Sequence, residues 1–440
     1  MKSYPKYKPT NIDWIGEIPK HWSSRKVAWS FKLIGSGTTP KSDSDLYYEN
    51  GIHNWLLTGD LTDGDIFETS KKITDLALIE TSSLKKYPIN SIVMAMYGAT
   101  IGKLGILKIE TTTNQACCVL ADSPFFDYKF VFYWMLSSRE SIINLSYGGG
   151  QPNINQDIVK GLRLTYPPLP EQQAIVSYLD QKTAQIDELI AKKQRKIELL
   201  KENRTALINH AITKGLDPTV KFKDSGIEWI GEIPEHWESI YLRHYYRKMG
   251  SGVTPKGGSE NYPDEGIKFI RSQNVHFEGL RLDDVVFISE VTYSEMQNSK
   301  VEKLDVLLNI TGASIGRCCI VEIDEPLNVN QHVCIIRTKK TLNSYFLNYF
   351  LKSSIGQEQI TFYTTGANRE GLSLEGVKSI SLSLTKILEQ QQIVDYLDTQ
   401  TSLIAQNINL ELQKIEKLKE YRQSLISNVV TGKICVLEED

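Results

Sequence analysis

Hydrophobic residues follow two different spacings along this chain. In most of it, short apolar runs such as 89–97 and 303–310 alternate with Gly, Asn, Asp and Pro, which predicts short strands and helices joined by turns. Two stretches are instead charged and helical in pattern, with apolar residues at alternating steps of four and three. We therefore expect two mixed α/β (α+β) regions in tandem, each followed by one long helix. The predicted boundaries are 1–165 and 216–383 for the α/β regions, 166–215 and 384–433 for the helices, and 434–440 for a C-terminal tail.

The second half of the chain repeats the first. Several segments recur in the same order, and the last pair lies inside the long helices, so each α/β region was duplicated together with its helix. The pairs are IDWIGEIPKHW from Ile12 and IEWIGEIPEHW from Ile227, GSGTTPK from Gly35 and GSGVTPK from Gly250, GATIGK from Gly98 and GASIGR from Gly312, Asn114-Gln115 and Asn330-Gln331, and EQQAIVSYLD from Glu171 and EQQQIVDYLD from Glu389.

Each long helix repeats its apolar residues every 3.5 positions over four heptads. This period is typical of a left-handed coiled coil, and two such seams in one chain can bury each other. We therefore expect the two helices to pair. The expected seam residues are Leu179, Ile186, Ile190, Ile197, Leu200 and Leu207 in the first helix, and Leu397, Ile404, Ile408, Ile415, Leu418 and Leu425 in the second.

The direction of pairing follows from dimensions. A helix of about 42 residues is roughly 63 Å long, whereas a compact domain of about 165 residues has a diameter of roughly 40 Å. Such a domain does not easily carry the chain back to the start of the first helix, so an antiparallel pair is predicted. The expected molecule has two α/β domains at opposite ends of a coiled-coil rod, related by a pseudo-two-fold axis.

Charged residues interrupt both seams at matching positions, Lys193 with Glu411 and Arg204 with Arg422. One explanation is that these long side chains extend past the seam into solvent. The other is that they set the register of the coil or bind partner subunits. The sequence leaves both explanations open.

The formal net charge of −3 does not by itself indicate a nucleic-acid partner. The two α/β regions differ in sign, because residues 1–165 hold 18 basic against 16 acidic residues and residues 216–383 hold 18 against 22. No apolar stretch suits a signal peptide or a membrane span, so we expect a cytoplasmic protein. The six cysteines lack zinc-ligand spacing and are expected to be buried free thiols.

The paired WIGEIP, GSGxTPK and GAxIG motifs and the two EQQxIVxYLD helices resemble the specificity subunit of a type I restriction-modification system. The resemblance covers nearly the whole chain. It implies that each α/β region is a target recognition domain for one half of a bipartite site in double-stranded DNA. It also implies that the helices set the number of uncontacted base pairs and bind two methyltransferase subunits, which recruit restriction and motor subunits.

The resemblance further implies a chain that is not an enzyme and has no metal or cofactor of its own, with S-adenosylmethionine, ATP and Mg²⁺ expected in the partner subunits. A fused enzyme would need an Asn- or Asp-Pro-Pro-aromatic element or a metal-binding carboxylate cluster. The segment 166–169, YPPL, lacks the required flanking residues. A protein-binding scaffold is the other alternative, favoured slightly by the acidic second domain, and salt-dependent binding to random duplex DNA would exclude it.

Residues identical in both halves cannot distinguish two different half-sites, so they are expected to serve the fold or the phosphates. The GSGxTPK and GAxIG loops combine glycine, hydroxyl groups and a cation, which suits phosphate contacts; plain turns are the alternative. The GAxIG loop is too short for a nucleotide-binding loop and lacks its Ser or Thr. The candidates for backbone contacts are Ser36, Thr39, Lys41, Lys103, Ser251, Thr254, Lys256 and Arg317.

Residues that differ between matching loops are expected to contact bases, for which Arg, Asn and Gln offer paired donors and acceptors. Residues 57–63 match 272–278 in the repeat, and 148–155 match 365–370. Ordinary exposed loops are the alternative. The candidates are Thr58, Asp60, Gln151, Asn153 and Asn155 in the first domain, and Arg271, Gln273, Asn274, His276, Asn368 and Arg369 in the second.

Four tryptophans belong to the WIGEIP motifs, namely Trp14, Trp22, Trp229 and Trp237. Because they are identical in both copies and flank a proline, we expect them to pack the domains rather than to stack on bases. The accompanying His21 and His236 are given no catalytic role.

Overall fold

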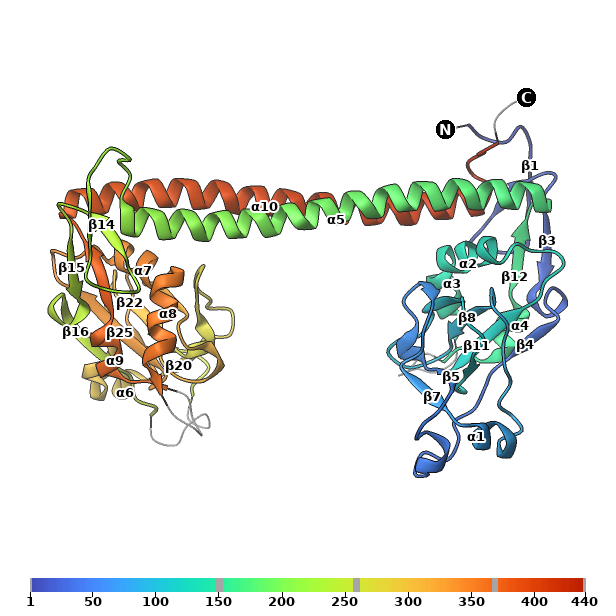
Figure 1. Ribbon diagram of the computed structural model, residues 1–440, viewed down its shortest axis with the longest axis horizontal. Coiled ribbons are helices and arrows are strands. Elements are labelled where there is room, and N and C mark those ends of the chain that lie inside the picture. The colour runs from blue at the N-terminus through green and yellow to red at the C-terminus, as the bar shows by residue number, and fades with distance from the viewer. Residues whose placement is uncertain (1, 147–152, 256–261, 366–370, 438–440) are drawn as a thin grey trace. The chain divides into compact units, whose positions relative to one another are not determined.

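The computed structural model divides into two compact units that interleave along the sequence (Figure 1). Residues 1–193 and 413–440 form the first unit, and residues 194–412 form the second. Each unit therefore combines one α/β domain with part of each long helix. Within the described part of the chain, no helix is long and apolar enough to cross a membrane. The described residues are 2–146, 153–255, 262–365 and 371–437.

The first domain is a mixed α/β fold. Its elements are β1 (Tyr7–Pro9), β2 (Glu17–Pro19), β3 (Ser23–Lys26), β4 (Leu33–Gly35), β5 (His53–Leu56), β6 (Gly64–Ile66), β7 (Lys71–Ile73), α1 (Asp75–Glu80), β8 (Ile92–Ala95), β9 (Leu104–Leu107), β10 (Thr112–Thr113), β11 (Cys117–Ala121), α2 (Tyr128–Ser137), α3 (Arg139–Asn144), α4 (Gln156–Gly161) and β12 (Arg163–Tyr166). Five strands form a sheet in the order β4-β11-β8-β9-β6, in which only β6 and β9 are parallel. A second sheet has the order β10-β5-β7.

The second domain repeats this arrangement. Its elements are β13 (Phe222–Asp224), β14 (Glu232–Pro234), β15 (Glu238–Tyr241), β16 (Tyr246–Ser251), β17 (Ile267–Ile270), β18 (Val275–His276), β19 (Gly279–Leu280), β20 (Val286–Ile288), α6 (Glu290–Glu295), β21 (Lys300–Val301), β22 (Val306–Asn309), β23 (Cys318–Ile320), β24 (Leu327–Val329), β25 (Val333–Thr338), α7 (Ser344–Lys352), α8 (Ser354–Tyr363), β26 (Thr364–Thr365), β27 (Gly371–Leu372), α9 (Leu374–Ser379) and β28 (Ser381–Leu384). The antiparallel sheet β16-β25-β22-β23 corresponds to β4-β11-β8-β9, and the sheet β20-β17-β24-β21 corresponds to the smaller one.

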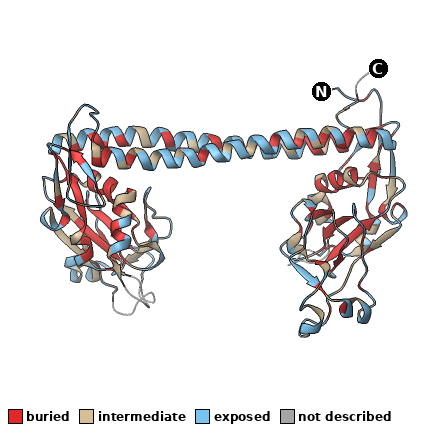
Figure 2. Ribbon diagram, in the orientation of Figure 1, coloured by how far each residue is buried: buried red, intermediate tan, exposed pale blue. Residues whose placement is uncertain are grey.

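Both faces of each main sheet are buried, which explains the unbroken apolar runs in the sequence. Successive strand residues face opposite sides: on β8, Met94 belongs to the core that includes α2, whereas Val93 belongs to a second core. On β22, Leu308 and Leu307 divide in the same way. Figure 2 shows the central strands and α2 as buried.

The cysteines mark the common register of the two sheets. Cys118 on β11 lies opposite Met94, and Cys334 on β25 lies opposite Leu308. Burial confirms the expectation of buried free thiols for all but Cys435, which is half-buried. It also raises the pKa to about 12 for Cys117, Cys118, Cys318, Cys319 and Cys334.

The long helices α5 (Leu169–Lys214) and α10 (Ile387–Val430) pair antiparallel, as predicted. In the first unit, Leu179 near the start of α5 shares a core with Val429 at the end of α10. In the second unit, Ile212 at the end of α5 shares a core with Leu397 near the start of α10. All of the predicted seam residues are buried or half-buried, which confirms the heptad assignment.

Two of the four charges within the seam, Glu411 and Arg422, form ion pairs rather than simply extending into solvent. Glu411 is only 3% exposed, and its carboxylate lies 2.9 Å from Lys196 Nζ in the second unit. In the first unit, Arg422 is half-buried and its Nε lies 2.9 Å from Asp187 Oδ1. Removing one partner of a buried pair leaves an uncompensated charge, so Glu411 constrains which residues can face it.

The first WIGEIP motif is fastened to the first EQQ motif, although the two are far apart in sequence. Glu171, at the start of α5, accepts hydrogen bonds from the Tyr4 hydroxyl at 2.6 Å and from Trp22 Nε1 at 3.0 Å. Its other carboxylate oxygen lies 2.8 Å from His21 Nε2. A buried carboxylate with three partners fixes how the domain meets its helix.

The second domain is joined to α10 by the same tryptophan and histidine contacts, but the other partner of the carboxylate is different. Glu389, near the start of α10, accepts a hydrogen bond from Trp237 Nε1 at 3.1 Å and lies 3.0 Å from His236 Nε2. The Thr385 hydroxyl donates to the same carboxylate. Burial opposes ionisation of Glu389, but these hydrogen bonds outweigh it and lower its pKa.

Burial of the motif tryptophans is uneven. Trp22 and Trp237 are completely buried, which confirms their predicted packing role. Trp229 is half-buried, with its ring centre 5.1 Å from that of Phe362. Trp14, in the turn before β2, is 37% exposed and lines a pocket with Leu145 and Ile158, so it packs against the domain only in part.

Candidate DNA-recognition site

Two of the repeated motifs, GSGxTPK and Asn-Gln, contact each other in both domains. In the first domain the Thr39 hydroxyl donates to Gln115 Oε1 at 2.7 Å. In the second domain Thr254 donates to Gln331 Oε1. These hydroxyl groups, which we expected to contact phosphates, therefore make hydrogen bonds within the protein.

The second glycine of GSGxTPK is required by a close approach of two backbones. A Cβ atom at Gly37 would lie 1.6 Å from the Thr113 carbonyl oxygen, and one at Gly252 would lie 1.7 Å from the Val329 carbonyl oxygen. No side chain fits at either position without displacing a neighbouring strand. The identity of this glycine in both copies is thus explained by the fold.

The GAxIG loops join β8 to β9 and β22 to β23. Gly98 and Gly312 open them at φ +81° and +73°, a left-handed conformation that glycine adopts without strain. A Cβ atom at either glycine would meet no atom within 4 Å, so the loop backbone is open to a ligand. Lys103 is exposed and Arg317 is half-buried after the loops. Among the described residues, none forms an ion pair or hydrogen bond with the Arg317 guanidinium.

The other predicted backbone contacts differ in accessibility. The Ser36 hydroxyl is buried, and it has no hydrogen-bond partner among the described residues. Ser251 is half-buried at the end of β16, and Lys41 is exposed. Lys256 lies outside the described residues.

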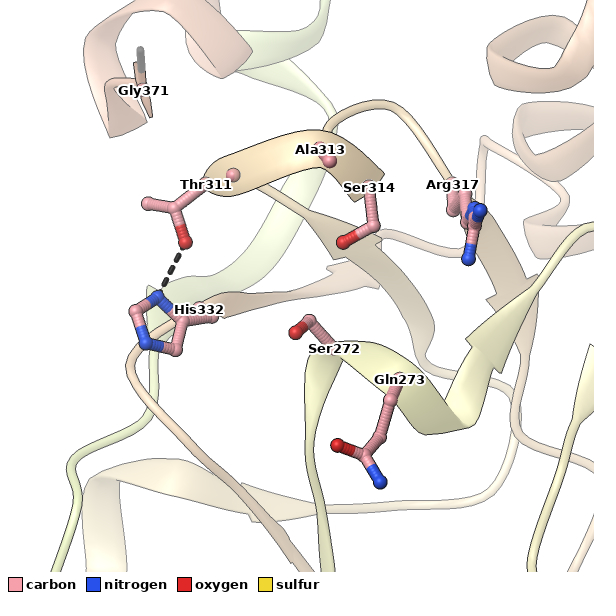
Figure 3. Close-up of a pocket in the computed structure, with 9 residues that line it drawn as sticks. Ser272, Gln273, Thr311, Ala313, Ser314, Arg317, His332 and Gly371 are labelled. Carbon is pink, nitrogen blue, oxygen red and sulfur yellow. Dashed lines mark hydrogen bonds between the residues drawn. The ribbon is translucent and has the colours of Figure 1, made fainter. Parts of the chain in front are cut away.

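A cavity of about 680 Å³ opens beside the second GAxIG loop (Figure 3). The hydroxyl groups of Ser272 and Ser314 point toward the side on which Thr311 and His332 lie, whereas the Gln273 amide points away from it. The cavity therefore presents several hydroxyl groups and an imidazole beside a cation. Its lining residues are Ser272, Gln273, Thr311, Gly312, Ala313, Ser314, Arg317, His332 and Gly371.

The base-contact candidates in residues 57–63 and 271–276 fall into two groups. Some stabilise the fold of their own loop, and others lie closer to the surface. Asn274 is completely buried; its Oδ1 accepts from Arg271 N at 2.9 Å, and its Nδ2 donates to Arg281 O and Asp284 Oδ1. The structure gives Asn274 a role in the fold of its own loop instead of the predicted base contact. Asp60 does the same in the first domain, where it accepts from Leu57 N at 2.8 Å.

The remaining candidates of these loops lie closer to the surface. Arg271 Nη2 donates to Asp284 O at 2.8 Å, and His276 Nε2 lies 2.8 Å from Gln273 O. Gln273 is exposed and lines the cavity, although its amide nitrogen is bound to Asp284. The structure shifts the predicted match of 57–63 with 272–278 by one residue, because Asp60 and Asn274 accept from the backbone of Leu57 and Arg271, respectively. Thr58 is therefore the counterpart of Ser272, and it is half-buried.

The structure corrects the predicted match between residues 148–155 and 365–370. Asn155 accepts from Ile158 N at 2.8 Å and thereby caps α4, whereas in the second domain Ser373 caps α9. The counterpart of Asn155 is therefore Ser373, and that of the exposed Asn153 is Gly371. The two loops differ in length, so no shared residue within them fixes which positions correspond. Gln151, Asn368 and Arg369 lie outside the described residues.

Sequence reasoning missed Thr311 and His332, although both line the cavity. Thr311 precedes the second GAxIG loop where Tyr97 precedes the first, and His332 follows the second Asn-Gln pair where Ala116 follows the first. Both positions differ between copies and adjoin identical motifs. The same comparison, extended one residue beyond each motif, would have found them.

The sequence matches the family described as "Type I restriction modification DNA specificity domain" over residues 19–199 and 235–420. The chain belongs to this family. Specificity subunits are the DNA-recognition components of type I systems and are not catalytic. Each matched segment begins at the end of a WIGEIP motif or just after it and runs through an α/β domain into the following long helix. The family segment therefore differs from the compact unit, which takes part of both helices.

Relatives of the specificity family match nearly the full length. The MjaVIII specificity subunit of Methanocaldococcus jannaschii is 24% identical over 425 residues, 95% of this chain and 94% of the relative. The EcoKI specificity subunit of Escherichia coli is also 24% identical, over 95% of this chain and 90% of the relative.

Solved structures share the fold. A chain described under "Structural basis underlying complex assembly and conformational transition of the type I R-M system" is 14% identical, with a TM-score of 0.74 over 95% of this chain and 99% of the other. The HsdS subunit from Thermoanaerobacter tengcongensis is 14% identical, with a TM-score of 0.54 over 95% and 98%.

Proposed function

We propose that this chain recognises a bipartite target in double-stranded DNA, one half-site per domain, within a type I restriction-modification complex. The observation that carries the proposal is a repeated framework whose surroundings differ. The contacts Thr39–Gln115 and Thr254–Gln331 are the same, whereas the residues that follow, Ala116 and His332, are not. Common contacts hold two similar surfaces, and differing side chains give them different base preferences.

Exchange of one domain tests this division of labour. Residues 216–383 are replaced by the corresponding segment of a relative, and the methylated sites are mapped in cells that also express the methyltransferase subunits. We expect one half of the target to change and the other to stay. The reciprocal exchange of residues 1–165 should change the opposite half. A change of both halves in either chimaera would contradict the proposal.

The helices are proposed to set the distance between half-sites and to bind two methyltransferase subunits, with restriction and motor subunits joining the full complex. Leucines outside the seam support a docking role, because Leu189, Leu199, Leu403 and Leu410 are between 42% and 48% exposed. The partner subunits would supply S-adenosylmethionine, ATP and Mg²⁺ chemistry, and this chain would supply recognition.

Lengthening the helices tests the distance. One heptad inserted after Lys201 in α5, together with one after Gln406 in α10, keeps an antiparallel seam matched and adds about 10.5 Å, or about three base pairs. We expect the gap between half-sites to grow while both half-sites stay unchanged. Insertion into α5 alone is the control, since it leaves the seam unmatched. An active double insertion with unchanged spacing would be inconsistent with this role.

A further inference from the structure

A chain of hydrogen bonds links the GSGxTPK loop of the second domain to its cavity. Thr254 donates to Gln331 Oε1, which leaves the Gln331 amide nitrogen to donate to His332 Nε2 at 3.1 Å. His332 then carries its proton on Nδ1 and donates it to Thr311 Oγ1. Because the Thr311 oxygen accepts this bond, the proton of its own hydroxyl remains available to a ligand in the cavity (Figure 3).

The first domain contains only the first link of this chain. Thr39 donates to Gln115, but the next residue, Ala116, has no polar side chain to continue it. Tyr97 replaces Thr311 before the loop. Of the two domains, the second therefore connects the common Thr–Gln contact to a hydroxyl group that faces the cavity. This difference can give the two domains different base preferences.

Other residues of the cavity offer hydrogen-bond donors whose orientation is fixed by bonds within the protein. Asn309 is buried, and its Nδ2 donates to Ser272 O at 2.8 Å and to Ser314 Oγ at 3.1 Å. Ser314 accepts that bond and so keeps its own proton for a ligand. Arg317 lines the same cavity with a cation that has no ion-pair partner among the described residues. Hydroxyl donors beside a cation suit a nucleotide, with its phosphate at the arginine and acceptor atoms of its base at the hydroxyl groups.

We propose that Thr311 and His332 determine the base preference at one position of the half-site bound by the second domain, and that Arg317 binds the adjoining phosphate. Thr311 contacts the base edge, and His332 is a positioning residue that orients the Thr311 hydroxyl. This inference rests on the proposed function, because it assigns a role within the second half-site.

Substitution of Thr311 tests the base contact. The full-length chain, co-purified with its methyltransferase subunits, is used to select bound duplexes from a random DNA library. T311V keeps the shape of the side chain but removes the hydroxyl, and should lower discrimination at one position of one half-site by about 10- to 100-fold. T311S should restore it. H332A should relax the same position, and H332N, which retains a donor toward Thr311, should relax it less.

The matched pair Q331A and Q115A separates positioning from a general structural effect. Each variant removes the same Thr–Gln hydrogen bond, but only Gln331 continues to a residue that lines a cavity. We expect Q331A to alter base preference in its half-site and Q115A to leave base preference intact. Unchanged preference in T311V, or equal changes in Q331A and Q115A, would overturn the inference and leave the proposed function standing. A wild-type chain that selects no pair of separated half-sites would overturn the proposed function itself.

Discussion

In the first domain the residue after the Asn-Gln pair is Ala116, and in the second it is His332, although Gln115 and Gln331 are held by the same threonine contact. The Thr–Gln contact is thus the same in both domains, and the side chains that differ between the domains lie next to it in the sequence. This comparison teaches that identity between copies need not indicate DNA contact, because internal hydrogen bonds and close backbone approaches already require it. Difference beside an identical motif is the better guide to recognition.

The two helix junctions make a second comparison. Glu171 is bonded to Tyr4 and its side chain is 8% exposed, whereas no tyrosine among the described residues bonds to Glu389, whose side chain is 30% exposed. The N-terminal segment therefore covers the first junction. The same histidine and tryptophan contacts consequently act in environments of different polarity.

The largest expected effect is the loss of stability when the buried tryptophan of either domain–helix junction is removed. Comparing the two variants tests whether the junctions are equivalent. Trp22→Ala and Trp237→Ala should each lower the free energy of unfolding by about 3–5 kcal/mol, because both side chains are completely buried. Denaturant unfolding, with hydrogen exchange to locate the loss, should show each variant weakening its own unit. A loss confined to one of the two variants would contradict the equivalence.

A smaller effect is expected for the close backbone approaches. Gly37→Ala and Gly252→Ala should each cost about 1–3 kcal/mol, because a strand must move to admit the methyl group. Thermal unfolding measures the loss. Gly59→Ala is the matched control, since a Cβ there would meet no atom within 4 Å and should change stability by no more than about 0.5 kcal/mol.

The second junction should respond to acid. The pKa of Glu389 is lowered in the folded protein, so its contribution to stability is present above the unfolded-state pKa of about 4.3 and is lost as pH falls through the lower folded-state value. Hydrogen-exchange protection in the second unit, taken relative to the intrinsic exchange rate at each pH, should therefore decrease in acid for the wild type. Glu389→Gln should weaken this dependence, and an unaltered acid response in that variant would argue against the junction as its source.

The smallest expected effect concerns phosphate binding. Arg317→Ala should weaken binding to all sequences to a similar extent and reduce the slope of log affinity against log salt concentration by about 1. Lys103→Ala is the first-domain counterpart and should behave in the same way if its loop also binds phosphate. Titrations of specific and random duplexes at several salt concentrations measure both. A change in base preference without a change in slope would assign Arg317 to the bases.

The helix seam could be predicted from sequence because a heptad repeat encodes its own geometry. Each position from Leu179 to Leu207 is specified by its neighbours three and four residues away, and partner helices need only matching periods. Burial of Trp22 followed similarly from a local motif. The fold class and the family assignment rested on such short-range, duplicated signals.

The junction contacts and the recognition cavity could not be predicted in the same way. Glu171 meets Trp22 across 149 residues, and His332 meets Thr311 across 21, so neither pair leaves a periodic signal. Asn155 was assigned to base contacts because a helix cap and a DNA contact use the same polar residue type. Only three-dimensional placement separates those roles.

The core of the first unit combines residues that the ribosome makes early with residues that it makes late. Leu425 and Val430, close to the C-terminus, fill the same core as Trp22. At about 5–20 residues per second, the ribosome needs roughly 13–50 s after the first α/β domain emerges before Leu425 is made. The second domain closes its core with Leu397 soon after its own strands are complete. The domain that leaves the ribosome first is therefore finished last, and its apolar surface around Leu179 must be kept from aggregating until residues 425–430 have been made.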